Sequence, residues 1–292
     1  MMTFREAARS KDFVISSELF LHPESTAEAI GEQVQLLSEC VDGILVTDNQ
    51  DGRLHLDPLA AAAIIKAHGG DPILQLACRN RNRIALLGEL LGAAALGISS
   101  LMLIRGNRVP RGFQPRPKAV YDIDAVELIE MASNIKTDEH LPSFPDFFVG
   151  GLVSPHVPAP GWKLDKLTRK ADAGAQFVMT HICMDLTVLR AYMKHLVAAG
   201  MPRRLSVFAS IAIPTSAADA RFLQQHHPSN LIPDDFVLRL DKAADSEQAA
   251  ISICAEFLRD LADIPGISGA HLVPTQNLAA VNAVIEEAGF AP

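Results

Sequence analysis

The sequence predicts an α/β protein, a single (β/α)8 TIM barrel that spans residues 1–292 as one catalytic domain. Three observations support this prediction: eight short apolar runs alternate with helical patterns, no break in composition divides the chain, and its 292 residues suit one barrel of about 250 residues with additions. Most runs are apolar almost throughout, which is typical of parallel strands covered on both faces. The expected strands are 13–20, 43–47, 73–77, 100–105, 147–152, 176–181, 205–211 and 269–274.

The segments between these runs carry the apolar spacing of helices, and residues 1–12 are expected to form a tail or short helix outside the barrel. Ser25, with Glu28 three positions later, predicts a capping box at the start of the first of these helices. An open doubly wound sheet is the structural alternative, but no GxGxxG motif follows the first run. The expected helices are 25–40, 57–68, 80–96, 122–135, 163–174, 186–199, 216–226 and 246–262.

Composition excludes several classes of protein. The formal net charge of −8 comes without a cluster of basic residues, so we expect no nucleic-acid partner. No apolar run is long enough for a membrane span and no apolar signal segment opens the chain, so a cytoplasmic location is expected. The four cysteines are far apart and form no CxxC pair, which argues against a disulfide framework and a metal site.

A carboxylate inside an apolar strand marks the first candidate for chemistry. Glu18 lies within VISSELF, where strand alternation gives even odds between an outward, salt-bridged position and an inward one. If Glu18 points into the mouth of a barrel, partial burial would raise its pKa and make it a usable general acid.

Other polar residues follow the expected strands, at the end of a barrel where active sites are built. Each also has a plain structural explanation. Asp48 and Asn49 are typical turn residues, Arg105 would pair with a neighbouring acid as readily as with a phosphate, and a lone loop histidine is more often exposed than catalytic. His181 and Asp185 resemble an acid–base pair but lack the spacing of a metal motif. The candidates are Thr47, Asp48, Asn49, Gln75, Arg79, Asn80, Arg105, Gly106, Asn107, His156, Thr180, His181 and Asp185, with two Pro- and Gly-rich loops at 107–118 and 153–162.

The order of short motifs along nearly the whole chain resembles the methylenetetrahydrofolate reductase family. The closest match is LTRKADAGAQFVMTHICMD at 167–185, which is similar to the family's Leu-Lys-x-Lys-x-x-Ala-Gly-Ala-x-Phe-x-x-Thr-Gln-x-x-Phe-Asp. Single motifs are weak signals, whereas seven in the right order are fairly specific. The other six are SSELF with HP at 16–23, ILVTDN at 44–49, LQLACRNRN at 74–82, LGISSLMLIRGN at 96–107, GGLVSPHVPAP at 150–160 and GAHLVPTQN at 269–277.

This resemblance implies a barrel that holds FAD at the carboxyl ends of its strands. NADH or NADPH reduces the flavin and leaves, and 5,10-methylenetetrahydrofolate then takes its place and is reduced to 5-methyltetrahydrofolate, a step that serves one-carbon metabolism and methionine biosynthesis. The family's general acid corresponds to Glu18, which would protonate a folate nitrogen as the five-membered ring opens. The resemblance assigns cofactor contacts to Thr47, Gln75, Arg105, Gly106, Asn107, His156, Arg169 and Lys170, and substrate contacts to Glu18, Asn107 and His181.

The chain departs from the family pattern at four places. Asn107 replaces an aspartate, which removes a negative charge near the flavin and should raise its potential. Gln75 replaces a histidine, His181 replaces the pterin-binding glutamine, and the loop after the fifth run lacks the family's Tyr and Glu. A flavin-independent methyl transfer enzyme and a non-catalytic folate-binding subunit therefore remain as alternatives, although the retained Glu18 argues against the second. The sequence allows a homo-oligomer and does not distinguish NADH from NADPH.

Overall fold

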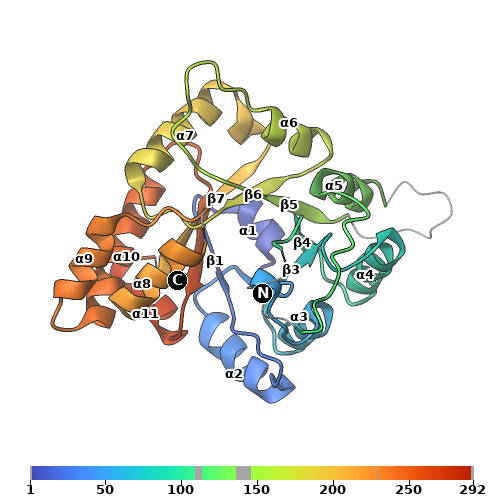
Figure 1. Ribbon diagram of the computed structural model, residues 1–292, viewed down its shortest axis with the longest axis horizontal. Helices are drawn as coiled ribbons and strands as arrows, with labels where there is room; N and C mark the ends of the chain where they lie inside the picture. Colours follow the sequence, from blue (N-terminus) through green and yellow to red (C-terminus); the bar gives the residue numbers. More distant parts are fainter. Residues whose placement is uncertain (1, 109–113, 136–145, 228, 291–292) are drawn as a thin grey trace.

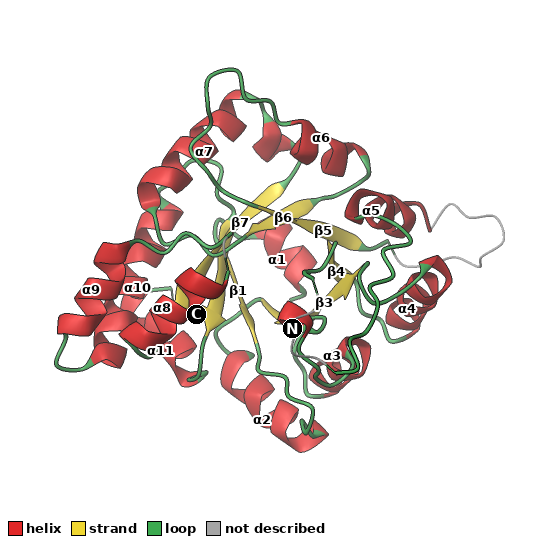
Figure 2. Ribbon diagram, in the orientation of Figure 1, coloured by secondary structure: helices red, strands yellow, loops and turns green. Residues whose placement is uncertain are grey.

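Eight parallel strands close into a barrel in the order in which they occur along the chain (Figures 1 and 2). This computed structural model describes residues 2–108, 114–135, 146–227 and 229–290, so part of the predicted loop 107–118 lies outside the described residues. The (β/α)8 prediction is confirmed, and each strand overlaps its predicted run. The strands are β1 (Val14–Glu18), β2 (Gly43–Val46), β3 (Pro72–Ala77), β4 (Ser100–Ile104), β5 (Phe148–Val153), β6 (Phe177–Thr180), β7 (Ser206–Ile213) and β8 (Gly269–Pro274).

Helices surround the strands on all sides (Figure 2). Eight follow the predicted segments, whereas α9 and α11 were not predicted. The predicted capping box at Ser25 is wrong: Thr26 caps the helix by accepting from Ala29 N, while Ser25 Oγ accepts from His22 N. The helices are α1 (Phe4–Ser10), α2 (Ala27–Leu37), α3 (Pro58–Ala67), α4 (Arg83–Ala95), α5 (Ala125–Asn134), α6 (Asp165–Asp172), α7 (Leu186–Ala198), α8 (Ala217–His226), α9 (Asp234–Lys242), α10 (Ser246–Ala262) and α11 (Ala279–Ala288).

The N-terminal segment forms a short helix that closes one end of the barrel. Phe4 in α1 is fully buried, and its ring lies 5.1–5.8 Å from those of Phe148, Phe177 and Phe208, centroid to centroid. These three residues lie in the amino-terminal halves of their strands, so α1 fills the end of the barrel opposite the mouth. In Figure 1 the faint α1 lies behind the strands, and the mouth faces the viewer.

Strand alternation decides which polar side chains face the interior. Val14 packs with Phe4 inside the barrel, so Ser16 and Glu18, at two and four positions further along β1, point the same way. Register then extends this layer across the neighbouring strands: Ser16 lies beside His271 in β8, and His271 lies beside Ser210 in β7. The interior therefore changes from phenyl rings at the α1 end to polar groups towards the mouth.

Candidate functional site

Glu18 ends β1 at the mouth of the barrel, and its inward position settles the choice that alternation left open. The residue is 8% exposed, and its Oε2 lies 4.0 Å from His271 Nε2. The other ring nitrogen of His271, Nδ1, lies 3.1 Å from Ser16 Oγ. Ser16, His271 and Glu18 thus form a buried polar row that leads from the interior to the rim.

Burial decides the charge of this row. Desolvation lowers the pKa of His271 from 6.5 to about 4, so the imidazole is neutral at physiological pH. At physiological pH the contact between His271 and Glu18 is therefore not an ion pair, although the distance between them would allow one. A neutral imidazole carries one N–H. Its proton is therefore either on Nδ1, directed at Ser16, or on Nε2, directed at Glu18, but not on both.

Three further inward side chains stand around the mouth. Thr47 follows β2 in the same alternation as the inward Leu45, and Gln75 in β3 lies beside the inward Met102 of β4. His181 follows β6, and burial, with lesser effects of Lys170 and His227, lowers its pKa. The structure thus places Glu18, Thr47, Gln75 and His181, all chosen from sequence, on one polar inner surface.

Asp48, predicted as a turn residue, has a larger structural role. Its side chain is fully buried and its Oδ2 accepts from Arg81 Nη1 at 2.5 Å and from Ala77 N at 2.8 Å. Arg81 also contacts Glu89 at 3.2 Å, and the attraction of these acids raises the pKa of its guanidinium against the opposing effect of burial. This network ties the carboxyl ends of β2 and β3 together. Asn49 does adopt a turn conformation, with φ of 46°.

The segment after β4 lies at the rim of the mouth. Arg105 is exposed, and its guanidinium carbon sits 4.1 Å from the centroid of the Tyr121 ring. Gly106 has φ of +83°, and an added Cβ would lie only 3.0 Å from Arg79 Cβ, so this turn requires glycine. The backbone carbonyl of Asn107 accepts from Arg79 Nη1 at 3.1 Å.

The remaining candidates lie on the outer side of this rim. The His156 ring packs against Trp162 and Tyr192, with centroids 4.5 and 5.4 Å away, which attaches the loop after β5 to α7. Arg169 in α6 is largely exposed, 3.9 Å from Asp124. Lys170 Nζ donates to the Leu152 carbonyl oxygen, and burial lowers its pKa. Asp185 caps α7 through Thr187 N and Val188 N, and no described contact pairs it with His181.

Some of these side chains offer hydrogen-bond donors that suit a flavin, and others do not. Arg105 and Arg169 are exposed cations that contact Tyr121 and Asp124, respectively, and guanidinium groups are suitable donors to a diphosphate. Thr47, Gln75 and the tight turn at Gly106 offer polar groups for a ring at the mouth. Lys170 and His156, by contrast, already contact other parts of the protein.

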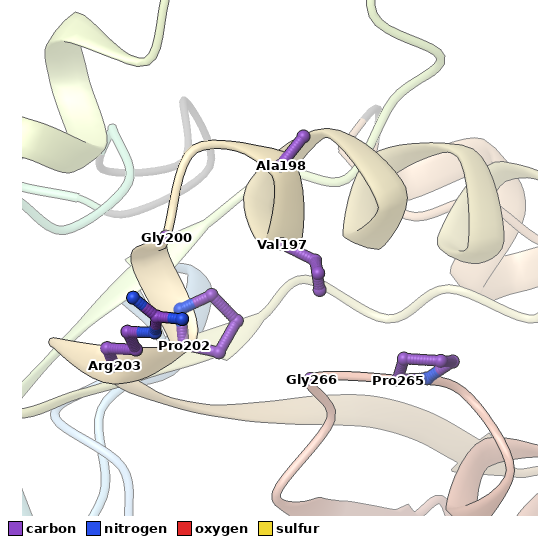
Figure 3. A pocket seen from close by; sticks show the side chains of 7 residues that line it. All are labelled: Val197, Ala198, Gly200, Pro202, Arg203, Pro265 and Gly266. Carbon is purple, nitrogen blue, oxygen red and sulfur yellow. The ribbon is translucent and has the colours of Figure 1, made fainter.

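One hollow on the surface lies away from the mouth. A depression of about 340 Å³ is bounded by Val197, Gly200, Arg203 and Pro265, between the end of α7 and the segment before β8 (Figure 3). These segments precede β7 and β8, so the depression lies at the α1 end of the barrel, away from Glu18. Among the described residues no group of His, Cys, Asp or Glu is arranged to hold a metal ion, and no described helix has the length and apolarity that a membrane crossing needs.

The sequence analysis selected Glu18 but missed the two other members of its polar row. Ser16 and His271 are polar residues in apolar strands, and that signal could have selected both. Their contact joins positions at opposite ends of the chain, which only closure of the barrel brings together. Arg79 was a candidate and Arg81 lay in the predicted helix 80–96, but the sequence did not show that Arg79 is buried and that Arg81 is nearly so.

Comparison with known proteins agrees with this description of the barrel. A probable methylenetetrahydrofolate reductase (NADPH) of Caenorhabditis elegans is 22% identical over 234 residues, which cover 79% of this chain and 34% of that protein. The chain thus spans about a third of the length of this relative. A solved structure of an uncharacterized protein from Clostridium thermocellum, described as binding two copies of 5-methyl-5,6,7,8-tetrahydrofolic acid, has the same fold, with a TM-score of 0.65, 13% identity and 97% of each chain covered. The family model for methylenetetrahydrofolate reductase matches residues 3–289, and the chain therefore belongs to the methylenetetrahydrofolate reductase family.

Proposed function

We propose that residues 1–292 act as a catalytic domain that reduces 5,10-methylenetetrahydrofolate to 5-methyltetrahydrofolate with NADH or NADPH, through a bound flavin. One observation carries the proposal: in a chain of this family, the inward carboxyl of Glu18 stands at the carboxyl end of β1, 4.0 Å from a neutral His271. The Clostridium thermocellum protein with the same fold, described as binding 5-methyltetrahydrofolate, supports folate as the ligand class.

The reaction needs a proton at a folate nitrogen and a hydride at the one-carbon unit. Glu18 gives the proton: the bond between the bridging carbon and nitrogen breaks, its electron pair stays on nitrogen, and nitrogen takes the proton from the carboxyl group. The hydride would come from a flavin, if one is bound at the mouth and kept reduced by NAD(P)H. Burial keeps His271 neutral, so its ring adds no positive charge at Nε2, 4.0 Å from Glu18 Oε2.

The remaining roles follow from where each side chain lies. We assign ligand contacts within the mouth to Thr47, Gln75 and His181, and contacts with the flavin diphosphate to Arg105 and Arg169. Gly106 and Asn107 would form the rim beside the flavin ring.

Two family assignments change in this proposal. His156 and Lys170, which the resemblance connects with the cofactor, are here given the role of holding the loop after β5 and the end of that strand.

A flavin-independent folate enzyme that transfers a one-carbon unit is the second candidate. It is favoured by Lys170, whose ammonium group is buried against the Leu152 carbonyl, and by Asn107, which lacks the charge that the family places beside the flavin. Both candidates use the same mouth and the same acid, and they differ in whether a flavin is bound.

Purification followed by two measurements tests the proposal. The absorbance spectrum of the protein, before and after addition of FAD, reports flavin binding, and 5-methyltetrahydrofolate oxidation is then assayed with an artificial electron acceptor. Flavin absorbance together with turnover supports the reductase. Folate binding without flavin selects the second candidate, and a protein that binds neither flavin nor folate refutes both.

A further inference from the structure

The segment after β3, CRNRN at 78–82, carries more polar side chains than a connection between a strand and a helix requires. Asn82 has a local role, because its Oδ1 caps α4 by accepting from Ala85 N. Arg81 forms the ion pair with Asp48. Arg79 is different: it is 2% exposed, and its described hydrogen bonds go to neutral oxygens only.

The Arg79 guanidinium joins three loops at the mouth. Its Nη1 donates to the Asn107 carbonyl at 3.1 Å, and its Nη2 donates to the carbonyls of Asp48 and Asn49 at 3.2 and 2.9 Å. Its Nε donates to Asn80 Oδ1 at 2.8 Å. The planar fork of arginine makes this possible, because it presents donors in fixed directions that the single ammonium group of lysine cannot reproduce.

Hydrogen bonds fix both the backbone carbonyl and the side chain of Asp48. Arg79 binds its carbonyl, while Arg81 and Ala77 N bind its carboxylate. The backbone N–H of Asp48 is thereby aimed at Gln75, whose Oε1 accepts from it at 3.0 Å. Because that bond fixes which end of the amide is oxygen, the NH2 group of Gln75 must face the other way.

The NH2 group of Gln75 faces the open mouth. Gln75 lies in the inward row of β3 beside Met102, near the carboxyl end of the strand. Among the described residues none forms a hydrogen bond with Gln75 Nε2. This nitrogen is also not among the unpaired polar atoms that are completely shielded from solvent. The nitrogen is therefore not fully buried, although Gln75 as a whole is only 9% exposed, and it has two protons to donate.

We propose that Arg79 is a positioning residue that, through Asp48, fixes Gln75 as a hydrogen-bond donor to the ligand. The ligand is then one that presents an acceptor, a carbonyl oxygen or an unprotonated ring nitrogen, at the β3 side of the mouth. The pyrimidinone edge of a pterin has such acceptors. Only this last identification rests on the proposed function.

Nuclear magnetic resonance of the free protein tests the positioning step without any ligand. The side-chain NH2 signals of Gln75 should shift and broaden in Arg79→Lys. Those of Gln33, whose amide is fixed by the backbone of Phe20, should not change. Arg83→Lys, an exposed change at the start of α4, directly after this segment, is the matched control and should leave both signals in place. If Arg79→Lys does not fold, Asn80→Ala removes one acceptor of the guanidinium and should broaden the Gln75 signals to a smaller extent.

A double-mutant cycle tests the step from Gln75 to the ligand. The dissociation constant of 5-methyltetrahydrofolate, measured by calorimetry, should rise about three- to tenfold in Gln75→Ala, as expected for one hydrogen bond, and by a similar factor in Arg79→Lys. The double variant should bind no more weakly than Gln75→Ala, because Arg79 acts through that side chain. Gln75→Glu should bind more weakly still, because its carboxylate cannot donate and would repel the acceptor atom of the ligand.

The two arms separate the possible failures. A wild-type protein that binds no folate refutes the proposed function, and the resonance experiment then still decides whether Arg79 orients Gln75. Unchanged Gln75 signals in folded Arg79→Lys, or factors that multiply in the double variant, would overturn the positioning role.

Discussion

Replacement of His271 should make the protein more resistant to acid. The ring is 3% exposed, and burial lowers its pKa from 6.5 to about 4. Above the unfolded value, neither the folded nor the unfolded chain holds this proton. Between the two values the unfolded chain takes it and the folded chain does not, so the stability of the folded state falls as the pH falls. The folded pKa is therefore the lower limit of the window in which stability is lost.

The size of this loss follows from the shift. The full difference of 6.5 to about 4 corresponds to about 3 kcal/mol, of which about 2.5 kcal/mol is lost between about pH 7.5 and about pH 4.5. Gln at position 271 cannot take up this proton. Between about pH 7.5 and about pH 4.5, the free energy of unfolding of His271→Gln should therefore fall by about 2.5 kcal/mol less than that of the wild type. Gln should still cost about 1 kcal/mol at the higher pH, because the contact with Ser16 is altered.

Urea unfolding followed by circular dichroism at several pH values measures both quantities. Ser210→Ala is the control, since Ser210 lies beside His271 in the register and carries no titrating group. This control should shift stability by the same amount at every pH. Wild type and His271→Gln with parallel pH profiles would refute a neutral, buried His271, and with it our account of the charge beside Glu18.

Four further substitutions test other parts of the structure. Glu18→Gln should lower turnover by at least about a hundredfold while folate binding persists, and near-normal turnover would remove Glu18 as the acid. Phe4→Ala should lower the free energy of unfolding by about 3 kcal/mol, measured in urea, because it empties the space among three rings; a loss below about 1 kcal/mol would mean that α1 does not fill the barrel end. Asp48→Asn leaves Arg81 buried without its closest acid and should cost about 3 kcal/mol, and an unchanged urea midpoint would argue against that ion pair. Asn107→Asp should lower the midpoint potential of a bound flavin, determined by spectroelectrochemistry, and an unchanged potential would place residue 107 away from the ring.

The barrel could be predicted because its strands are buried on both faces. Such burial produces short apolar runs, which can be recognised without knowing which strands pair. The strand β8, for example, was predicted at the residues where it occurs. The helix α9 was missed because Asp234–Lys242 is short and mostly polar, and it is stabilised by packing on α10 rather than by a strong pattern of its own. The cap of α2 was misplaced by one residue because Ser25 and Thr26 have equivalent hydroxyl groups, and only the contact with His22 distinguishes them.

The residues of the candidate site could be predicted from the sequence, but the contacts between them and the orientations of their side chains could not. Glu18, Thr47 and Gln75 were selected because polar groups at strand ends stand out among apolar neighbours. Their orientations depend on contacts between distant segments, such as the one between Asp48 and Gln75, which no local pattern contains. For the same reason the sequence could not tell that Arg79 is buried, since a buried arginine and an exposed one occur in the same kind of segment.

The contrast between the two ends of the barrel limits how Glu18 can exchange its proton. At the α1 end the interior is filled by the rings of Phe4, Phe148, Phe177 and Phe208, which offer no polar group for a proton to follow. The polar row stops at Ser16, whose hydroxyl can donate to His271 or towards the Ala270 carbonyl, 3.5 Å away. In the proposed reaction, Glu18 is therefore reprotonated from the mouth, directly or through His271, and a ligand bound over the mouth would exclude water from both. Protonation of Glu18 should then precede closure of the site by substrate, so the acid would be loaded in the free enzyme and appear in the pH dependence of kcat/KM.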